Sequence, residues 1–172
     1  MGPSTLPEIR LRPAAPEDRF LLRRWLAEPE AQSWWGTSAS AEAEITLAMA
    51  STAAVTRILE CDGAPAGYAH AVEAGLLAQA WPVPAGTWSV DYVVAPAAGN
   101  LTELGAAALL LLTQDVFETT LAVACSGLVS IRHEARTRAY ERAGFRWRHV
   151  LHDLMCGPSW LMLKERPERS AR

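Results

Sequence analysis

The chain has 172 residues, of which half are hydrophobic and a fifth are charged, and its formal net charge is −3. This length and composition are ordinary for a globular protein, so we expect a single domain over residues 1–172. The slightly acidic balance argues against nucleic acid as a partner, because no basic field would attract phosphates. The longest apolar run, LGAAALLLL, is shorter than the about 20 residues that span a bilayer, so we expect no membrane segment.

The N-terminal stretch MGPSTLPE has neither the basic start nor the apolar centre of a secretory signal. Cys61, Cys125 and Cys156 stand far apart, in no spacing typical of a metal site or a disulfide framework. We therefore expect reduced thiols, no metal and a cytoplasmic location. The sequence says little about oligomeric state, for which we expect a monomer or a homodimer.

The first elements alternate between strand and helix patterns. IRLRP (9–13) predicts a half-buried strand, and APEDRFLLRRWLAEPE predicts a helix that starts at Pro16 and is limited by Pro29. SWWG then interrupts the pattern as a loop. SAEAEITLAMA predicts a second helix, with Ser40 as a plausible N-cap.

The central part predicts a hairpin followed by a strand and a long helix. Two β-type runs flank Asp62-Gly63, the strongest short turn signal in the chain. GLLAQAWPVPAG is a loop, and TWSVDYVVA is a strand rich in β-branched and aromatic residues. The polar stretch of Asn100, Leu101 and Thr102 then leads into an apolar helix that runs to about Phe117.

The last third adds a strand at TLAVAC (120–125), a helix at HEARTRAYERAG that Gly144 closes, and two strands around Gly157-Pro158. The complete order predicts a mixed α/β fold built mainly on hairpins with few crossovers. We expect the strand at 88–94 to splay from the strand at 120–125 and form a cleft.

The last third, HEARTRAYERAGFRW, resembles the C-terminal motif of the GNAT acetyltransferase superfamily. That motif reads Asn, then Arg-Ala-Ile, then Tyr-Glu-Lys-x-Gly-Phe. The chain keeps Tyr140, Gly144 and Phe145 and has His133 where Asn usually stands. AEPEAQSWWG, GTWSVDYVV and GPSWLMLKERP are similar to the 6'-type aminoglycoside N-acetyltransferases and the acyltransferases of siderophore biosynthesis. The similarity covers nearly the whole chain, in the right order.

The resemblance implies the GNAT fold, a mixed, mostly antiparallel sheet flanked by helices, and acetyl-CoA as cofactor. In that superfamily a loop of the form Gln/Arg-x-x-Gly-x-Gly/Ala holds the pyrophosphate of coenzyme A on backbone N–H groups at a helix start. The pattern falls on residues 100–105, and only its last glycine, Gly105, is retained. Leu101, Thr102, Leu104, Gly105 and Ala106 are then the expected backbone donors.

Glu103 stands where the superfamily has the first glycine of this loop, with Asn100 at the Gln/Arg position. A carboxylate in the first helical turn suits the helix dipole by itself, but it would repel a pyrophosphate that it faced. Two interpretations follow: either Glu103 turns outward and tolerates the cofactor, or it takes the place of the phosphate.

The resemblance also implies the catalytic groups. Asp91 lies in the middle of an apolar strand, where a carboxylate is costly unless it is paired or used; it matches the proposed base, or amine contact, of the aminoglycoside enzymes, unless it merely faces outward at an edge. Tyr140 matches the tyrosine near the thioester sulfur, with a plain core aromatic as the alternative. Val93 or Val94 would donate its backbone N–H to the acetyl oxygen, and His133 would bond the pantetheine arm.

Trp34 and Trp35 are expected at the acceptor site, because two adjacent bulky aromatics cannot easily both face inward on a short turn; plugging the core is the alternative. The neutral loop AGLLAQAWPVP argues against a highly cationic acceptor and for a smaller or more apolar amine. Six arginines lie between Arg132 and Arg148. They either form a solvated helix face, with Glu134 and Arg138 as an i,i+4 pair, or offer one cation to a phosphate.

Three functions agree with these features. The first is an acetyl-CoA-dependent N-acetyltransferase acting on a primary amine of a small molecule, resembling an aminoglycoside or a siderophore precursor. The second is a non-catalytic GNAT fold that has lost strong cofactor binding and serves as a binding or regulatory module. The third is an acyltransferase that uses a different thioester.

Overall fold

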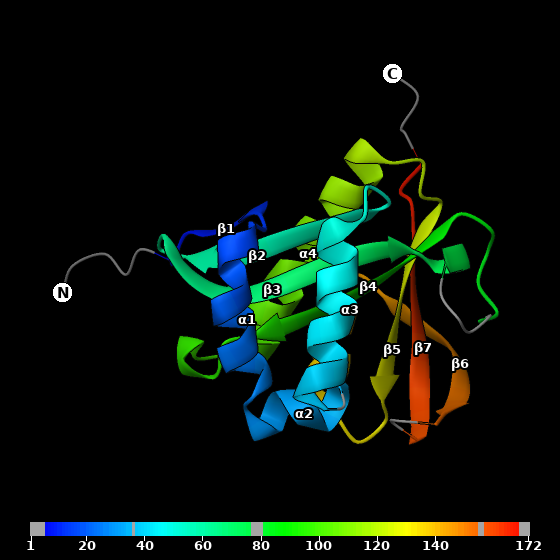
Figure 1. The fold of residues 1–172 in the computed structure, drawn as a ribbon. Helices are drawn as coiled ribbons and strands as arrows, with labels where there is room; N and C mark the ends of the chain where they lie inside the picture. The colour runs from blue at the N-terminus through cyan, green and yellow to red at the C-terminus, as the bar shows by residue number, and fades with distance from the viewer. Residues whose placement is uncertain (1–5, 36, 77–80, 155–156, 169–172) are drawn as a thin grey trace.

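The computed structural model describes residues 6–35, 37–76, 81–154 and 157–168. The described residues form a seven-stranded sheet in the order β1-β2-β3-β4-β5-β7-β6, and among these strands only the β4–β5 pair is parallel (Figure 1). The strands are β1 (Ile9–Pro13), β2 (Ala54–Cys61), β3 (Ala64–Glu73), β4 (Thr87–Val94), β5 (Ala124–Ser130), β6 (Arg146–Asp153) and β7 (Gly157–Glu165). The predicted mixed, mostly antiparallel sheet is confirmed.

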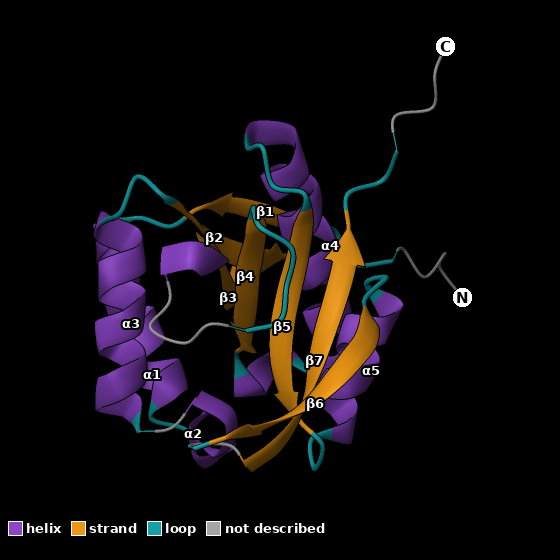
Figure 2. Cartoon of the chain, turned by 90° about the vertical axis from the view of Figure 1, so that its right-hand side faces the viewer, coloured by secondary structure: helices purple, strands orange, loops and turns teal. Residues whose placement is uncertain are grey.

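Helices cover both faces of the sheet (Figure 2). On one face lie α1 (Arg19–Leu26), α2 (Pro29–Trp35) and α3 (Ser38–Ala50), and on the other lie α4 (Leu101–Thr119) and α5 (Glu134–Arg142). Short 3-10 turns at Pro16–Asp18, Ala74–Leu76 and Pro96–Ala98 lead into α1, follow β3 and precede α4. Among the described residues, no helix combines the length and apolarity needed to cross a membrane.

The hairpin between β2 and β3 turns at the residues that the sequence indicates. Asp62 and Gly63 both have positive φ, 51° and 79°. Such a two-residue turn matches the twist of the flanking strands, and Gly63 adopts it without a steric penalty. The prediction of this hairpin is confirmed.

Three local predictions are wrong. SWWG is not wholly a loop, because α2 begins at Pro29 and includes Ser33 to Trp35; proline opens a helix readily at its first position. The cap of α3 is Thr37, whose hydroxyl accepts from Ser40 N, and not Ser40 itself. The strand predicted at 120–125 begins at Ala124 and runs to Ser130.

The sheet separates two apolar cores. One lies under α4 and α5 and includes Leu109, Leu112 and Tyr140, and the other lies under α1 to α3 and includes Leu26, Ile58 and Tyr68. The side chains of β4 alternate between them, with Val90, Tyr92 and Val94 in the first core and Val93 in the second. β4 therefore stands between both halves of the molecule.

Candidate active site

The parallel pair of β4 and β5 closes at one end of the sheet and opens at the other. The two strands are paired over three residues, Thr87 to Ser89 against Ala124 to Ser126, and the pairing then stops. The rest of β4 faces an opening on this side. The predicted splay between these two strands is thus confirmed, although β5 lies further along the chain than expected.

The register of β4 decides which of its backbone groups face the opening. Ala95 N donates to Ala66 O at 2.7 Å, so the N–H groups of alternate residues, including Val93, point toward β3. The N–H groups of Tyr92 and Val94 then point toward the opening. Of the two valines expected to stabilise the acetyl oxygen, Val94 is therefore the one whose N–H faces the opening.

Tyr140 fills the inner end of the opening. Its side chain is 0% exposed, and its hydroxyl donates to Val90 O, the first carbonyl beyond the last strand pair, at 3.0 Å. Gly127 is needed here, because a Cβ at that position would lie 2.2 Å from Tyr140 Cε1. Burial raises the pKa of Tyr140 well above its ordinary value, so the phenol stays protonated.

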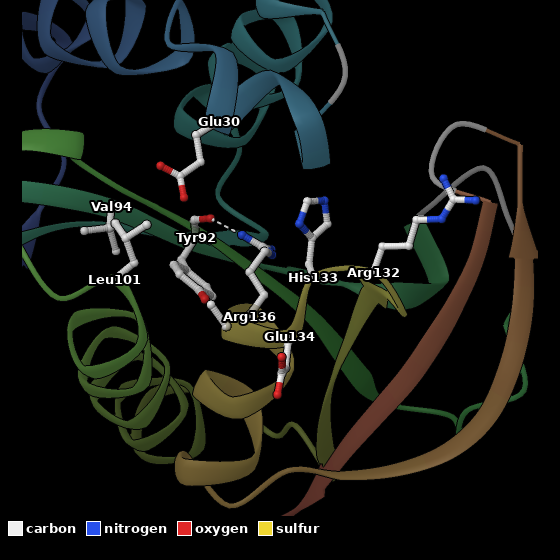
Figure 3. A pocket seen from close by; sticks show the side chains of 9 residues that line it. Glu30, Tyr92, Val94, Leu101, Arg132, His133, Glu134 and Arg136 are labelled. Carbon is white, nitrogen blue, oxygen red and sulfur yellow. Dashed lines mark hydrogen bonds between the residues drawn. The ribbon is translucent and has the colours of Figure 1, made fainter.

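Arg136 lies one helical turn before Tyr140 and fills the outer part of the opening (Figure 3). It is 6% exposed. Its Nη1 donates to Tyr92 O at 3.1 Å, and its Nη2 donates to Asp91 Oδ1 at 2.6 Å. The guanidinium carbon lies 4.5 Å from the centre of the Tyr92 ring. Burial, the largest single influence, would lower the pKa of Arg136, but the charge of Asp91, its hydrogen bond and the neighbouring Tyr92 and Tyr140 together outweigh it, so the pKa is raised.

Asp91 completes this arrangement. Its Oδ1 also accepts from Tyr92 N at 2.7 Å, and its side chain is 29% exposed. The ion pair of Asp91 and Arg136 therefore satisfies both main-chain groups of Tyr92, as a neighbouring strand would. The cost of placing a carboxylate in this strand is met by pairing.

A cavity of about 220 Å³ lies beside the ion pair. Its walls come from α2, β4, the start of α4 and the residues that lead into α5: Glu30, Tyr92, Val94, Leu101, Arg132, His133, Glu134, Ala135 and Arg136. Figure 3 shows Glu30 above the guanidinium of Arg136 and Glu134 below it. His133 Nε2 lies 3.4 Å from Ser33 O of α2, which places this side chain at the rim between the two helix layers.

The start of α4 forms another part of the rim, and its first N–H groups are partly used. Asn100 caps the helix: its side chain accepts from Glu103 N at 3.2 Å and its carbonyl from Leu104 N at 3.0 Å. Thr102 Oγ1 donates to Ala135 O at 3.5 Å and so contacts α5. Glu103 is 65% exposed at its side chain and lies 3.8 Å from Arg142 Nη1. Its carboxylate is therefore turned outward.

Gly105 and Ala106 lie behind this rim. A Cβ at Gly105 would approach the Tyr92 ring to 2.7 Å, so the glycine is required for α4 to pack on β4. Ala106 is partly buried against the same core. Close packing is sufficient to explain the retained glycine, and its expected role toward a phosphate stays a prediction.

The opposite face of the sheet carries a buried polar cluster next to Asp91. His70 is paired in register with Asp91 across β3 and β4, and its Nδ1 lies 3.2 Å from the Tyr68 hydroxyl. Its Nε2 lies 3.5 Å from Glu44 of α3, and this hydrogen bond lowers the pKa of Glu44. Trp35 packs on both rings, with centroids 5.6 Å from His70 and 6.4 Å from Tyr68.

Trp35 is partly buried and packs against the second core, and its expected role at the acceptor site stays a prediction. Its Nε1 is buried and has no hydrogen-bond partner among the described residues. The side chain of Trp34, the other residue expected at the acceptor site, lies outside the described part of the molecule, as do residues 77–80 of the loop before β4 and Cys156.

A family model described as an acetyltransferase (GNAT) domain matches residues 15–152. The chain belongs to this GNAT acetyltransferase family. Among solved structures, the aminoglycoside acetyltransferase AAC(6')-Ib, in complex with coenzyme A and kanamycin, matches with a TM-score of 0.78 at 23% identity, covering 92% of this chain and 95% of that one. A spermidine N-acetyltransferase from Vibrio cholerae, in complex with CoA and spermine, matches with a TM-score of 0.67 at 14% identity, covering 91% and 95%. No curated protein sequence matches the chain.

At these identities the two structures show the shared fold and nothing of the acceptor. The expected GNAT fold and its similarity to the 6'-type aminoglycoside enzymes are confirmed. The sequence predicts the start of α4 as the place for the pyrophosphate of coenzyme A, and this stays a prediction. Among the described residues, no group of His, Cys, Asp and Glu side chains could hold a metal ion.

In the opening between β4 and β5, the edge of β4 has one main-chain group that an acetyl thioester could use and two that are already bonded. The cavity borders β4, and the N–H of Val94 faces the opening, so a chain with amide groups has a strand edge to pair with. The N–H and carbonyl of Tyr92, however, are already bonded to Asp91 and Arg136. With the ion pair in place, the part of this edge that can pair with a thioester is the N–H of Val94 and not the two main-chain groups of Tyr92.

Sequence reasoning did not single out Arg136 or His70. Arg136 was one of a run of arginines on a helix, for which a solvated face was one interpretation; that interpretation holds for Arg138, which pairs with Glu134, and is wrong for Arg136. His70 had a usable signal: Tyr68 and His70 alternate with alanines in a strand, so they share one face. That face is the one on which Asp91 is paired in register with His70.

Proposed function

We propose that the protein is an acetyl-CoA-dependent N-acetyltransferase that acetylates a primary amine of a small molecule. The observation that carries this proposal is the opening between β4 and β5, with its cavity of about 220 Å³ between the free edge of β4 and the starts of α4 and α5. Asp91, Tyr140 and Val94 all lie along that opening.

Bound acetyl-CoA would supply an activated acetyl group, and the chain would supply an N–H donor and two proton-handling groups. The carboxylate of Asp91 takes a proton from the substrate ammonium and leaves a free amine. The N–H of Val94 donates to the acetyl oxygen, where negative charge develops as the C–N bond forms and the C–S bond breaks. The hydroxyl of Tyr140 would exchange its bond to Val90 O and give its proton to the departing sulfur, and the second proton that the nitrogen loses as the amide forms would restore the hydroxyl.

Two features support a small and weakly charged acceptor. The segment between β3 and β4 carries no acidic residue, and Glu73 at the end of β3 is the one beside it, whereas a polycation would need several carboxylates. On the face that carries Asp91, the cluster of Tyr68, His70 and Trp35 is aromatic. A compact or apolar amine suits this environment better than an oligosaccharide with many ammonium groups.

The location and assembly follow as lesser parts of the proposal. The thiols of Cys61 and Cys125 are free, which suits a reducing compartment such as the cytoplasm. We place residues 1–172 in a single catalytic domain that works as a monomer or a homodimer, with neither nucleic acid nor membrane as a partner.

A second function is favoured by one observation: the ion pair of Asp91 and Arg136 satisfies the strand edge without a ligand. A GNAT domain that had lost its cofactor and become a binding module would look like this. The two functions differ in whether coenzyme A binds to the purified protein at all.

The test is to incubate the purified protein with acetyl-CoA and a panel of primary amines, and to detect acetylated products by mass spectrometry. The panel should contain an aminoglycoside, a polyamine, and small aromatic and aliphatic amines. We expect acetylation of a small aromatic or aliphatic amine, and less of the polycations. If coenzyme A does not bind, the catalytic proposal is overturned in favour of the binding module.

A further inference from the structure

The ion pair of Asp91 and Arg136 occupies the backbone groups that a ligand in the opening would need. Asp91 Oδ1 accepts from Tyr92 N at 2.7 Å, while Arg136 Nη1 donates to Tyr92 O at 3.1 Å. A strand edge left without such partners would leave a buried N–H and carbonyl unsatisfied. The pair therefore acts as a substitute for the strand that β5 fails to provide.

The same pair controls the carboxylate that the proposed reaction needs. Arg136 Nη2 lies 2.6 Å from Asp91 Oδ1, so the positive charge opposite this carboxylate is that of Arg136 and not of a substrate ammonium. A cation that competes for Asp91 must displace a guanidinium that is nearly fully buried. As long as Arg136 stays in place, an amine meets at Asp91 a carboxylate whose charge is already paired and whose Oδ1 already accepts two hydrogen bonds.

We propose that Arg136 is a positioning residue that holds Asp91 and the Tyr92 edge until an acyl thioester takes that edge, and that its displacement then frees Asp91 for the amine. This inference rests on the proposed function, because it assigns an order to the two substrates of that reaction: thioester first, amine second. The amide groups of the thioester's pantetheine arm replace the two bonds to Tyr92, and Arg136 gives them up.

The cavity beside Arg136 contains two other carboxylates with which the guanidinium could pair after it leaves Asp91. Glu30 from α2 and Glu134 from the start of α5 line the same cavity, above and below Arg136 in Figure 3. The two other basic groups of the cavity wall are Arg132, which is exposed, and His133. A guanidinium that leaves Tyr92 thus remains close to two carboxylates, which limits the cost of moving it.

The test measures whether the affinity for coenzyme A rises or falls when the charge of Arg136 is removed. Coenzyme A is an anion, so the loss of a nearby cation should weaken its binding. The proposal predicts the opposite for Arg136→Ala, because the strand edge is opened. Isothermal titration with coenzyme A should show an affinity about tenfold or more above that of the wild type. The gain is expected because the variant no longer populates the state in which Arg136 occupies the strand edge, which dominates the free wild-type protein.

Three further variants make the result specific. Arg132→Ala removes an exposed cation from the same cavity without touching β4, and should bind coenzyme A no better than the wild type. Arg136→Met keeps most of the side-chain volume, so it guards against a folding defect of the alanine variant and should also gain affinity. Asp91→Asn removes the charge that holds Arg136 and should gain affinity too, which a purely structural role for Arg136 would not produce.

The outcomes separate the inference from the proposed function. Higher affinity for coenzyme A in the folded Arg136 and Asp91 variants, with no gain in Arg132→Ala, supports the proposed role of Arg136. Equal affinity in the wild type and all variants overturns that role and leaves the acetyltransferase proposal standing. Absence of binding in every protein overturns both, provided that circular dichroism shows each variant to be folded.

Discussion

The two ends of the opening between β4 and β5 are filled from the same helix by opposite means. At the inner end the Tyr140 ring is locked against Gly127, and its hydroxyl bonds a carbonyl of β4. At the outer end, one turn earlier on α5, Arg136 uses charge and hydrogen bonds to hold Asp91 and Tyr92. The ring cannot leave without a void, because a packed core has no second arrangement. The guanidinium can leave, because any chain with amide groups can replace its bonds.

This contrast assigns close packing to the inner end and replaceable bonds to the outer end. Substitutions at Gly127 should be felt first in the free energy of unfolding, and those at Tyr140, the proposed acid, in both the free energy of unfolding and turnover. Substitutions at Asp91 or Arg136 should be felt first in ligand binding and turnover.

Asp91→Asn at the outer end should lower acetyl transfer by about 100-fold or more, the usual contribution of a positioned base. The loss should appear in kcat, while the KM for acetyl-CoA falls, because Arg136 is released from its partner. Steady-state kinetics with an identified acceptor amine would measure both constants. Unchanged turnover would remove Asp91 from the mechanism and with it the functional half of the contrast.

Gly127→Ala at the inner end should destabilise the fold by roughly 1–3 kcal/mol, the cost of overpacking a tight core site. The reason is the 2.2 Å separation between the added Cβ and Tyr140 Cε1, which forces β5 or α5 to shift. Urea denaturation would measure the change. Gly75→Ala is the matched control, since a Cβ there meets nothing within 4 Å and should leave the midpoint unchanged.

Tyr140→Phe should cost about 1 kcal/mol at neutral pH, because Val90 O loses its hydrogen bond. The pKa of Tyr140 is raised by burial, so its protonated form stabilises the fold fully below pH of about 10, the ordinary tyrosine value. Above that value the unfolded chain loses the proton while the folded chain keeps it, so stability falls as pH rises.

The wild type should therefore lose stability more steeply than Tyr140→Phe between pH of about 10 and 11. Denaturation curves of both proteins at several alkaline pH values would measure the two slopes. Parallel slopes would mean that the hydroxyl of Tyr140 is not buried in solution, and that the inner end is open to solvent like the outer end.

Glu103→Gln should have the smallest effect. Its carboxylate is exposed and turned toward Arg142, and exposed ion pairs of this kind contribute up to about 1 kcal/mol. Coenzyme A affinity should change by no more than about fivefold, which is the same free energy, and the change should shrink in high salt. A gain as large as that of Arg136→Ala would make the carboxylate, and not the ion pair, the obstacle to binding.

The parts of the fold with a local signal were predictable from the sequence. The Asp62-Gly63 turn, the long apolar helix and the tyrosine helix ended by Gly144 each follow from the preferences of a few adjacent residues. β5 was misplaced because TLAVAC has the apolar pattern of a strand, whereas SGLVS contains two serines and a glycine, which are typical of turns. Gly127 is required in that strand by a tertiary contact, because a Cβ there would meet the ring of Tyr140.

The candidate site was predictable in its residues and not in their pairing. Asp91 stood out because a carboxylate in an apolar strand needs a reason. Its partner Arg136 lies 45 positions away on a helix, and nothing in the local sequence separates it from the exposed arginines beside it. The pairing depends on the splay of β4 from β5, which places the side chains of α5 between two strands.

The most direct measurement of the central claim is a crystal structure of the wild-type protein with coenzyme A. We expect the ligand to lie in the opening along β4, with its amide groups bonded to Tyr92 N and Tyr92 O and with Arg136 away from both Tyr92 and Asp91. A complex in which coenzyme A is bound while Arg136 still donates to Tyr92 O and Asp91 would contradict it.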